Sequence, residues 1–411
     1  MRRQIEGSRA VAKAVALCRP RVIPAYPISP QTHIVEALSA RVAAGVLKPC
    51  EFINAESEFG AMSLAIGASA AGGRAYTATA SQGLLFMAEA LYNAAGLGLP
   101  IVMTVANRAI GAPINIWNDH SDAMSQRDSG WVQLYAESNQ EAVDLHLLAF
   151  RLAEELSLPV MVCMDGFVLT HAVEAVDLPD QADVDAFLPP YQPRQVLDPA
   201  DPVSIGAMVG PEAFTEVRYL AHVRQVELLD RLPHLAGELA AVTGRQVGAV
   251  SPYRCDDAET VVVALGSVLG TLKDTVDELR DERVPVGVLG VTAFRPFPFE
   301  AVATALAGAR KVVVLERAFA TGVGGIVTAD VRAARPGTAC HTVVAGLGGR
   351  PVTSASLRGM LLDAVAGRLE PLTFLDLNRE VVDRELTRAA ATRRSGPTAE
   401  NVLHDLRGGA R

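Results

Sequence analysis

Two kinds of hydrophobic pattern alternate along the first 175 residues. Short runs such as Pro100–Val105 are largely apolar, which is typical of strands buried on both faces of a sheet. Between such runs, apolar residues recur at i, i+3, i+4 and i+7, as from Leu84 to Leu91 in a helix that Ser81 is predicted to cap. The alternation predicts an α/β protein with a parallel sheet covered on both faces. The predicted strands are Arg21–Tyr26, Phe52–Ala55, Tyr76–Ala80, Pro100–Val105, Val132–Tyr135 and Pro159–Cys163, and helices are predicted over Ser57–Ala71 and Gln140–Leu156.

The pattern changes after residue 176. Seven prolines fall within 177–212, which predicts a long surface linker, and a helix is predicted from Glu212 to Thr243. A second α/β unit follows, with strands predicted at Thr260–Leu265, Val286–Leu289, Lys311–Leu315 and Thr342–Ala345. The chain is therefore divided into a first domain (1–176), a linker with a helical segment (177–245), a second domain (246–368) and a C-terminal tail (369–411). Residues 388–411 are expected to be frayed or bound to a partner.

Composition narrows the range of partners. The net charge of −9 argues against nucleic acid or an anionic membrane as a main partner, because both require a basic face. No run of about 18 apolar residues occurs, and the first apolar stretch is interrupted at Lys13, so neither a membrane span nor a signal peptide is expected. The five cysteines are scattered, which is typical of reduced thiols in a cytoplasmic protein and offers no iron–sulfur or zinc cluster.

Polar residues follow three of the predicted strands, at the sheet edge where ligands bind in open parallel sheets. Ser29 lies in a loop with two prolines and is a candidate for ligand contact or for capping the next helix. Glu58 begins a helix of small residues, where an acid either takes part in chemistry or complements the helix dipole. Arg108 follows Pro100–Val105 and suits either a ligand carboxylate or an ion pair at a surface.

Motifs that bind phosphate groups are missing. The chain has no GxxxxGK[ST] loop, no GxGxxG after a strand and no GxSxG elbow. It also lacks the GDG with a downstream asparagine that holds diphosphate and Mg²⁺ in thiamine enzymes, since Asp165-Gly166 has neither the first glycine nor the asparagine. The glycine-rich segments Gly322–Gly325 and Gly346–Gly349 match none of these motifs. The chain is therefore not expected to hold a phosphorylated cofactor unaided.

Several long segments together resemble the alpha subunit of pyruvate:ferredoxin oxidoreductase and its close relatives, the 2-oxoacid:ferredoxin oxidoreductases. The resemblance covers about residues 5–365 and is collinear. Its most specific parts are TATASQGL and APINIWNDHSDAMSQRDSGW. It also includes AYPISPQTHIVEAL, RPFPFE and VAGLGGRPVT.

The resemblance implies a fold and a division of labour. The fold is a thiamine-enzyme pyrimidine-binding parallel-sheet domain followed by a transketolase C-terminal-like α/β domain. Thiamine diphosphate is shared with a beta subunit that supplies the diphosphate-binding domain, Mg²⁺ and a [4Fe-4S] cluster, and gamma and delta subunits complete the enzyme. Glu58 matches the family glutamate that bonds N1′ of the cofactor's pyrimidine, and Arg108 matches the arginine that grips the 2-oxoacid carboxylate. Ser29 matches a substrate-contacting position that is usually threonine, and His33 a position that is often apolar or proline.

The expected activity is the oxidative decarboxylation of pyruvate with coenzyme A to acetyl-CoA, CO₂ and reduced ferredoxin, or the reverse reaction. Three alternatives stay open at the level of the sequence. The first is that the enzyme acts on another 2-oxoacid, such as 2-oxoisovalerate, oxalate or 2-oxoglutarate. The second is that the chain is a non-catalytic assembly subunit, and the third is that it is a stand-alone thiamine enzyme. The last requires a diphosphate site that the sequence does not offer.

Overall fold

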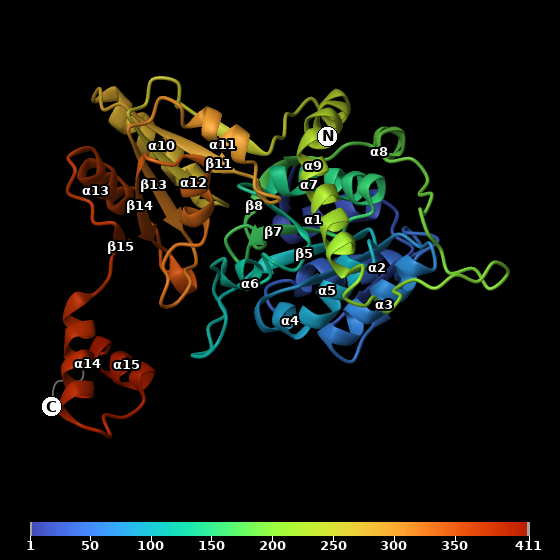
Figure 1. The fold of residues 1–411 in the computed structure, drawn as a ribbon, viewed down its shortest axis with the longest axis horizontal. Helices are drawn as coiled ribbons and strands as arrows, with labels where there is room; N and C mark the ends of the chain where they lie inside the picture. Colours follow the sequence, from blue (N-terminus) through green and yellow to red (C-terminus); the bar gives the residue numbers. More distant parts are fainter. Residues whose placement is uncertain (1, 409–411) are drawn as a thin grey trace.

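The structure, a computed structural model, describes residues 2–408 and consists of two large parallel sheets with helices on their faces (Figure 1). The prediction of an α/β protein with two parallel-sheet units is confirmed. Residues 409–411, the end of the predicted tail, lie outside the described residues. In the described part, no helix is both long and apolar enough to cross a membrane.

The first sheet has seven strands in the order β12-β6-β7-β5-β4-β2-β3, and every pair from β6 to β3 is parallel. β5 is buried at all of its positions, which explains why its sequence is almost uninterruptedly apolar. The strands are β2 (Val22–Ala25), β3 (Glu51–Asn54), β4 (Ala75–Thr79), β5 (Ile101–Asn107), β6 (Val132–Tyr135), β7 (Val160–Asp165) and β12 (Ala293–Arg295).

Helices cover both faces of this sheet. On one face, α1 (Gly7–Leu17), α2 (Thr32–Ala43) and α7 (Asn139–Leu156) share a core with Ile23 and Val160 of the strands. On the other face lie α3 (Glu58–Ala70), α4 (Ser81–Phe86), α5 (Ala88–Gly96) and the short α6 (Ser121–Ser125). The core of this second face continues into Leu289 and Val312 of the second sheet, so the two sheets share buried apolar side chains.

The second sheet has the order β15-β14-β13-β10-β11-β9, in which only β9 runs antiparallel. Its strands are β9 (Val250–Tyr253), β10 (Thr260–Ala264), β11 (Val286–Val291), β13 (Lys311–Glu316), β14 (Ala339–Val344) and β15 (Leu372–Phe374). α10 (Val268–Asp281) and α13 (Ser354–Val365) bury Leu272 and Leu361 against one face. α11 (Phe299–Ala305) and α12 (Val327–Ala334) cover the other, and a 3₁₀ turn, η1 (Leu347–Gly349), follows β14.

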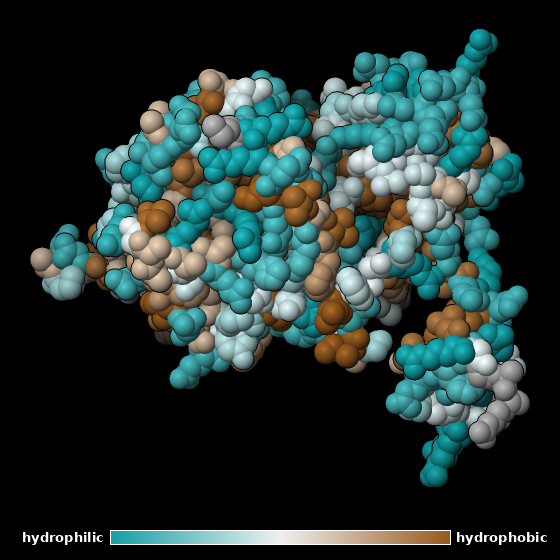
Figure 2. Space-filling model, turned by 180° about the vertical axis from the view of Figure 1, so that it is seen from behind, coloured by the Kyte–Doolittle hydropathy of each residue, from teal (hydrophilic) through white to brown (hydrophobic). Residues whose placement is uncertain are grey.

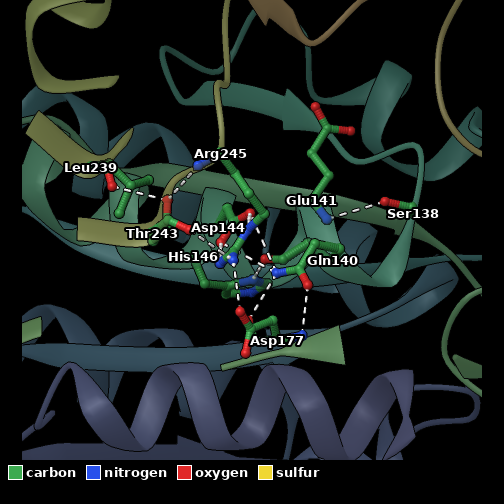
Figure 3. A network of polar contacts seen from close by, with 10 residues as sticks. Ser138, Gln140, Glu141, Asp144, His146, Asp177, Leu239, Thr243 and Arg245 are labelled. Atoms are coloured by element: carbon green, nitrogen blue, oxygen red, sulfur yellow. Dashed lines mark hydrogen bonds and ion pairs between the residues drawn. The ribbon is translucent and has the colours of Figure 1, made fainter. Parts of the chain in front are cut away.

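The linker carries more structure than its proline content predicts. Directly before the linker, β8 (Val173–Asp177) forms a separate antiparallel pair with β1 (Arg2–Glu6), and the linker itself contains α8 (Gln181–Phe187). After an irregular stretch, α9 (Phe214–Thr243) packs on α7. The end of the linker is then fixed to α7, because Nε and Nη2 of Arg245 both donate to the Asp144 carboxylate at 2.7 Å (Figure 3).

Three expectations from the sequence are wrong in detail. The helix predicted after Ser81 is broken at Met87 into α4 and α5, although its apolar stripe is buried as expected. Ser81 does not cap that helix: its φ is +49°, and its hydroxyl donates to the carbonyl oxygen of Ala109. Of the two expectations for residues 388–411, fraying is wrong for most of the described part, because it contains the end of α14 (Arg379–Ala391) and α15 (Thr398–Leu406), while β15 precedes both helices.

The pair of helices α14 and α15 stands apart from the two sheets in both overall views (Figures 1 and 2). Arg388 pairs with the Asp405 carboxylate, and Asn401 donates to Glu385, so the helices hold each other. An arrangement of this kind agrees with the second half of the expectation for residues 388–411, that they bind a partner, and this remains a prediction.

Candidate active site

The candidate residues all lie at one edge of the first sheet. Because β2, β3, β4 and β5 run parallel, their carboxyl ends meet at the same edge, and the loops that follow carry Ser29, Glu58 and Arg108. Carboxyl ends of the second sheet face this edge as well, since Ser267 after β10 and Arg317 after β13 both contact Asp165 at the end of β7. The site therefore lies where the ends of two sheets meet.

Glu58 is the first residue of α3. Ser57 caps this helix by accepting a hydrogen bond from the Gly60 N–H at 3.0 Å, so the Glu58 side chain is not needed as the cap. The Glu58 residue is 8% exposed, and within residues 2–408 its carboxylate makes no hydrogen bond or ion pair. Burying a carboxylate without a hydrogen-bond partner costs free energy of folding, unless a bound ligand supplies the partner.

Gly83 makes room for the Glu58 carboxylate. A Cβ atom at position 83 would lie 2.8 Å from Oε1 of Glu58, so any larger residue there would displace the carboxylate. The buried hydroxyl of Thr79 adjoins the same space, and it has no hydrogen-bond partner among the described residues. An unpaired carboxylate and an unpaired hydroxyl thus face each other across Gly83, which provides both an acceptor and a donor for a polar ligand.

Arg108 and Ser29 are brought into direct contact. Nη1 of Arg108 donates to the carbonyl oxygen of Ser29 at 3.0 Å, and Nε donates to the carbonyl oxygen of Asn115 at 3.1 Å. The arginine is 7% exposed, and its side chain forms no salt bridge within the described part of the chain. Burial lowers the pKa of Arg108, and the Asp122 carboxylate opposes this effect. The guanidinium is therefore held by neutral carbonyls, which leaves its charge free for an anion.

The Asp122 carboxylate binds the backbone of the segments that follow β4 and β5. Its carboxylate is fully buried and accepts hydrogen bonds from the backbone N–H groups of Ser81 and Arg108, both at 2.9 Å. It also accepts from the Asn107 side-chain amide and the Ala123 N–H, each at 2.8 Å. Burial raises the pKa of Asp122 to about 6, while the hydrogen bonds, that of Asn107 foremost, lower it. Asp122 thus ties the end of β4 to the end of β5.

The loop 109–120 is held by the second sheet. Asn115 Nδ2 donates to the carbonyl oxygen of Gly348 at 3.1 Å, and the Gly348 N–H donates to Oδ2 of Asp119 at 2.9 Å. Gly349 approaches Trp117 so closely that a Cβ atom at position 349 would clash with the Cβ of the tryptophan. Gly346, Gly348 and Gly349 all have positive φ values, of 68°, 57° and 78°. The glycine-rich segment after β14 therefore grips a protein loop instead of a phosphate.

Asp165 is the second buried acid at this junction. Its Oδ1 accepts from the His120 ring at 2.8 Å, and its Oδ2 accepts from the N–H and the hydroxyl of Ser267 and lies 3.7 Å from Nη1 of Arg317. Burial alone would raise the pKa of Asp165, but His120 and Arg317 hold it well below its ordinary value. Asp165 therefore stays charged and joins the loop 109–120 to the strand ends of the second sheet.

A large cavity lies elsewhere. It has a volume of about 840 Å³ and is lined by Trp131, Leu229 and Phe297, among others. Trp131 precedes β6, so the cavity opens at the amino ends of the strands. None of the candidate residues lines it, so it is separate from the candidate active site.

Sequence reasoning therefore found the residues whose side chains follow a strand directly, and missed those that hold them. The structure places Ser29 against Arg108, and Glu58 beside the neighbouring strand end, without a direct contact to either. Asp122 and Asn115 lie in a polar stretch that the family resemblance covers, but the resemblance gave neither residue a role. Nothing in the spacing predicts that Asp122 folds back under β4 and β5.

Comparisons with known proteins agree with this geometry. Residues 13–230 match the family model "Pyruvate flavodoxin/ferredoxin oxidoreductase, thiamine diphosphate-binding", and residues 258–357 match "Pyruvate:ferredoxin oxidoreductase core domain II". The chain is 46% identical to pyruvate synthase subunit PorA of Methanosarcina barkeri, over 92% of this chain and 97% of that one. It is 37% identical to ketoisovalerate oxidoreductase subunit VorA of Pyrococcus horikoshii, over 88% and 93%.

A solved structure shows the same fold. It is the 2-oxoglutarate:ferredoxin oxidoreductase of Magnetococcus marinus with 2-oxoglutarate, coenzyme A and succinyl-CoA bound. The TM-score is 0.70 at 19% identity, and the match covers 89% of this chain and 65% of that one. The two sheets and the site at their junction thus define a thiamine diphosphate-binding oxidoreductase subunit. The chain belongs to the pyruvate:ferredoxin oxidoreductase family.

Proposed function

We propose that this chain is the subunit of a pyruvate:ferredoxin oxidoreductase that supplies the pyrimidine-binding half of a thiamine diphosphate site. The observation that carries the proposal is the Glu58 carboxylate, which is largely buried, makes no bond within residues 2–408 and faces the space kept open by Gly83. The division into a first domain at 1–176 and a second at 246–368 belongs to the same proposal. The enzyme is proposed to be cytoplasmic.

Glu58 would bind the pyrimidine ring of the cofactor through N1′. Bound thiamine diphosphate supplies an electron sink for decarboxylation of a 2-oxoacid. The contribution of Glu58 is to share a proton with the ring nitrogen, which requires a carboxyl group in a site from which water is largely excluded. The unpaired hydroxyl of Thr79 offers a further hydrogen bond at the same place.

Arg108 would bind the carboxylate of the substrate. Its guanidinium keeps part of its donor capacity, because its hydrogen bonds to the carbonyl oxygens of Asn115 and Ser29 use only Nε and Nη1. Those two carbonyls fix the plane of the guanidinium, so the bound acid is oriented toward the cofactor and not merely attracted. Ser29 would contact the substrate with its exposed hydroxyl, while its carbonyl holds the arginine.

A partner subunit is proposed to complete the site. The chain lacks a diphosphate motif, and exposed apolar side chains gather in the segments around the half-site. Phe59 and Phe86 stand 6.3 Å apart between ring centroids on the helices next to Glu58, and Ile114 in the loop 109–120 is 80% exposed. We propose that a beta subunit with the diphosphate-binding domain, Mg²⁺ and a [4Fe-4S] cluster covers this edge, and that gamma and delta subunits, coenzyme A and ferredoxin complete the reaction.

Pyruvate is the proposed substrate. Arg108 recognises a carboxylate that all 2-oxoacids share, so the guanidinium does not choose among them. The choice rests on similarity, because the identity to a pyruvate synthase subunit (46%) exceeds that to a ketoisovalerate oxidoreductase subunit (37%). Kinetic comparison of pyruvate, 2-oxoisovalerate and 2-oxoglutarate with the purified complex tests this choice.

The function is tested with Glu58→Gln in the complex assembled from all its subunits. Glutamine keeps the size of the side chain but cannot share a proton, so pyruvate-dependent reduction of ferredoxin should fall by about 10²–10⁴-fold. The matched control is Glu56→Gln, since Glu56 is exposed and lies two residues away. Full activity in Glu58→Gln would remove this residue from the proposed role, and an equal loss in the control would point to damage of the α3 start.

A further inference from the structure

Outside the active site, one group of side chains within residues 2–408 has the composition of a metal site. The ligand atoms of Glu6, His33 and His171 lie within 4.8 Å of one another. Nδ1 of His33 is 2.6 Å from Oε1 of Glu6, and the rings of His33 and His171 are 4.7 Å apart between centroids. The three residues come from distant parts of the sequence: the end of β1, the first turn of α2 and the turn between β7 and β8.

Two imidazoles and one carboxylate select a class of ion. Nitrogen donors favour zinc and the neighbouring first-row divalent metals, whereas Mg²⁺ and Ca²⁺ prefer sites made only of oxygen. Ligand atoms around a tetrahedral zinc ion are about 3.4 Å apart. Glu6 and His33 are closer than this and the whole group is slightly wider, so small side-chain rotations would bring the three atoms into place. A water molecule would take the fourth position, as in other three-ligand sites.

Two neighbouring groups hold the side chains in position. Nδ1 of His171 lies 2.7 Å from the hydroxyl of Thr170, which leaves Nε2 for an ion. Thr170 is fully buried and its hydroxyl also accepts the Phe167 N–H at 2.8 Å, so the hydroxyl is fixed. On the other side, the Arg9 guanidinium lies 3.3 Å from Oε2 of Glu6, which leaves Oε1 turned to His33. Such supporting contacts orient metal ligands and raise affinity.

The site is accessible from solvent. The His33 side chain keeps 46% of its surface exposed and that of Glu6 18%, so an ion can reach both without unfolding of the chain. The cluster is therefore neither a fully buried hydrogen-bonded pair nor a scattered surface group.

We propose that Glu6, His33 and His171 bind one zinc-class divalent cation. The ion would join the β1–β8 pair to α2 and to the turn that follows β7. His33 lies four residues after Ser29, whose carbonyl oxygen holds Arg108, so the ion would stiffen the loop on which the arginine rests. The site is separate from the proposed cofactor site, and it does not depend on the reaction that the chain performs.

Metal binding is tested on the purified full-length chain. The chain is treated with a chelator, desalted and titrated with Zn²⁺ in competition with a chromophoric chelator. Binding of Co²⁺, followed by its visible absorption, reports nitrogen ligation independently. We expect one tight Zn²⁺ per chain and an increase in the thermal unfolding midpoint on its addition. His33→Ala and Glu6→Gln should each weaken Zn²⁺ binding by at least about 10-fold and abolish the increase in the midpoint.

Glu6→Gln keeps the shape of the side chain, so it separates loss of a ligand from loss of the fold. The control is His222→Ala, which removes another exposed histidine, on α9. Equal Zn²⁺ affinity in the wild type, His33→Ala and Glu6→Gln would overturn the proposal. So would weakening in His222→Ala to the same extent, because binding would then be a general property of surface histidines. Since activity is not the readout, failure here would leave the proposed function of the enzyme untouched.

Discussion

Asn115 joins the second sheet to the candidate substrate arginine. Its side-chain amide donates to the carbonyl oxygen of Gly348 at 3.1 Å, and its backbone carbonyl oxygen accepts from Nε of Arg108 at 3.1 Å. A displacement of the glycine-rich segment after β14 must therefore move Asn115 and, with it, one of the two carbonyls that orient the guanidinium. If Arg108 binds the substrate as proposed, this contact would give the second sheet an indirect role in substrate binding, although it contributes none of the proposed ligands.

The first prediction concerns Gly349. In Gly349→Ala, the new methyl group would clash with the Cβ of Trp117 and displace the loop 109–120. Since this loop carries Asn115, we expect the KM for pyruvate to rise by about 10-fold while kcat falls less, because ground-state and transition-state binding are weakened together. Steady-state kinetics of the assembled complex measure both constants.

Gly337→Ala is the matched control for this variant. Gly337 also has a positive φ, of 84°, but a Cβ atom there would meet no neighbour within 4 Å. Both variants carry the backbone cost of a left-handed alanine, which is about 1 kcal/mol, whereas only Gly349→Ala adds the clash. Equal KM values in the two variants would contradict the coupling between the second sheet and Arg108.

The second prediction concerns the shape of the Arg108 side chain. In Arg108→Lys the charge stays, but one ammonium group cannot bond the carbonyls of Ser29 and Asn115 and also a substrate carboxylate in two-point geometry. We expect the KM for pyruvate to rise by about 10–100-fold. Arg310→Lys is the control, because the Arg310 side chain is 78% exposed. An unchanged KM in Arg108→Lys would show that charge alone suffices, or that the carboxylate binds elsewhere.

The third prediction concerns Asp122 and stability. Asp122→Ala would leave the buried N–H groups of Ser81 and Arg108 and the Asn107 amide without their acceptor. Unpaired buried donors cost about 1–3 kcal/mol each, partly offset by the release of a buried charge, so we expect a net loss of about 2–4 kcal/mol. Chemical unfolding of the purified chain measures this loss. A smaller loss than 1 kcal/mol would mean that water replaces the carboxylate.

The sheets could be predicted from the sequence because their strands are buried on both faces. β6 was predicted with the bounds that it has, Val132–Tyr135, and α9 within two residues at its start. β12 was missed because three residues carry no periodicity, and it joins the first sheet although it lies in the second half of the sequence. Only tertiary contact decides where so short a strand pairs.

In the candidate site, too, some residues could be predicted from the sequence and others could not. Glu58 and Arg108 stand next to strands, so position along the chain was enough to select them, and the family resemblance gave their expected roles. Asn115 and Gly348 are separated by more than 230 residues, and Asp165 and Ser267 by about 100, so no local pattern relates them. The glycines at 346, 348 and 349 match no phosphate motif and lie in a segment of the family resemblance, but the sequence does not show that their positive φ values serve a protein contact.

A groove between the first sheet and the end of the linker supports a pH-dependent prediction. Glu141 lies at the start of α7 and lines this groove with Glu137 and Thr292. Its Oε2 accepts the Glu137 N–H at 2.7 Å, and the Ser138 hydroxyl accepts the Glu141 N–H at 3.2 Å. Figure 3 shows the Glu141 carboxylate pointing away from the pair formed by Arg245 and Asp144, so no arginine neutralises it there.

Burial raises the pKa of Glu141 from an ordinary 4.5 to about 7. The hydrogen bond from the Glu137 N–H and the nearby Lys273 ammonium oppose this shift, while the Glu137 carboxylate adds to it. Because the folded state holds the proton more tightly than the unfolded state, the stability cost of ionising Glu141 is absent below about pH 4.5, grows as the pH rises and is complete above about pH 7.

Glu141→Gln keeps an acceptor for the Glu137 N–H and never ionises. Since Glu141 keeps part of its surface exposed, we expect a gain of only about 1 kcal/mol at pH 8 and almost none near pH 5. Thermal unfolding midpoints of the wild type and the variant at both pH values measure the difference, and Glu56→Gln, at an exposed position, should show no such trend. A gain of equal size at both pH values would mean that the glutamine packs better and that the charge of Glu141 costs nothing.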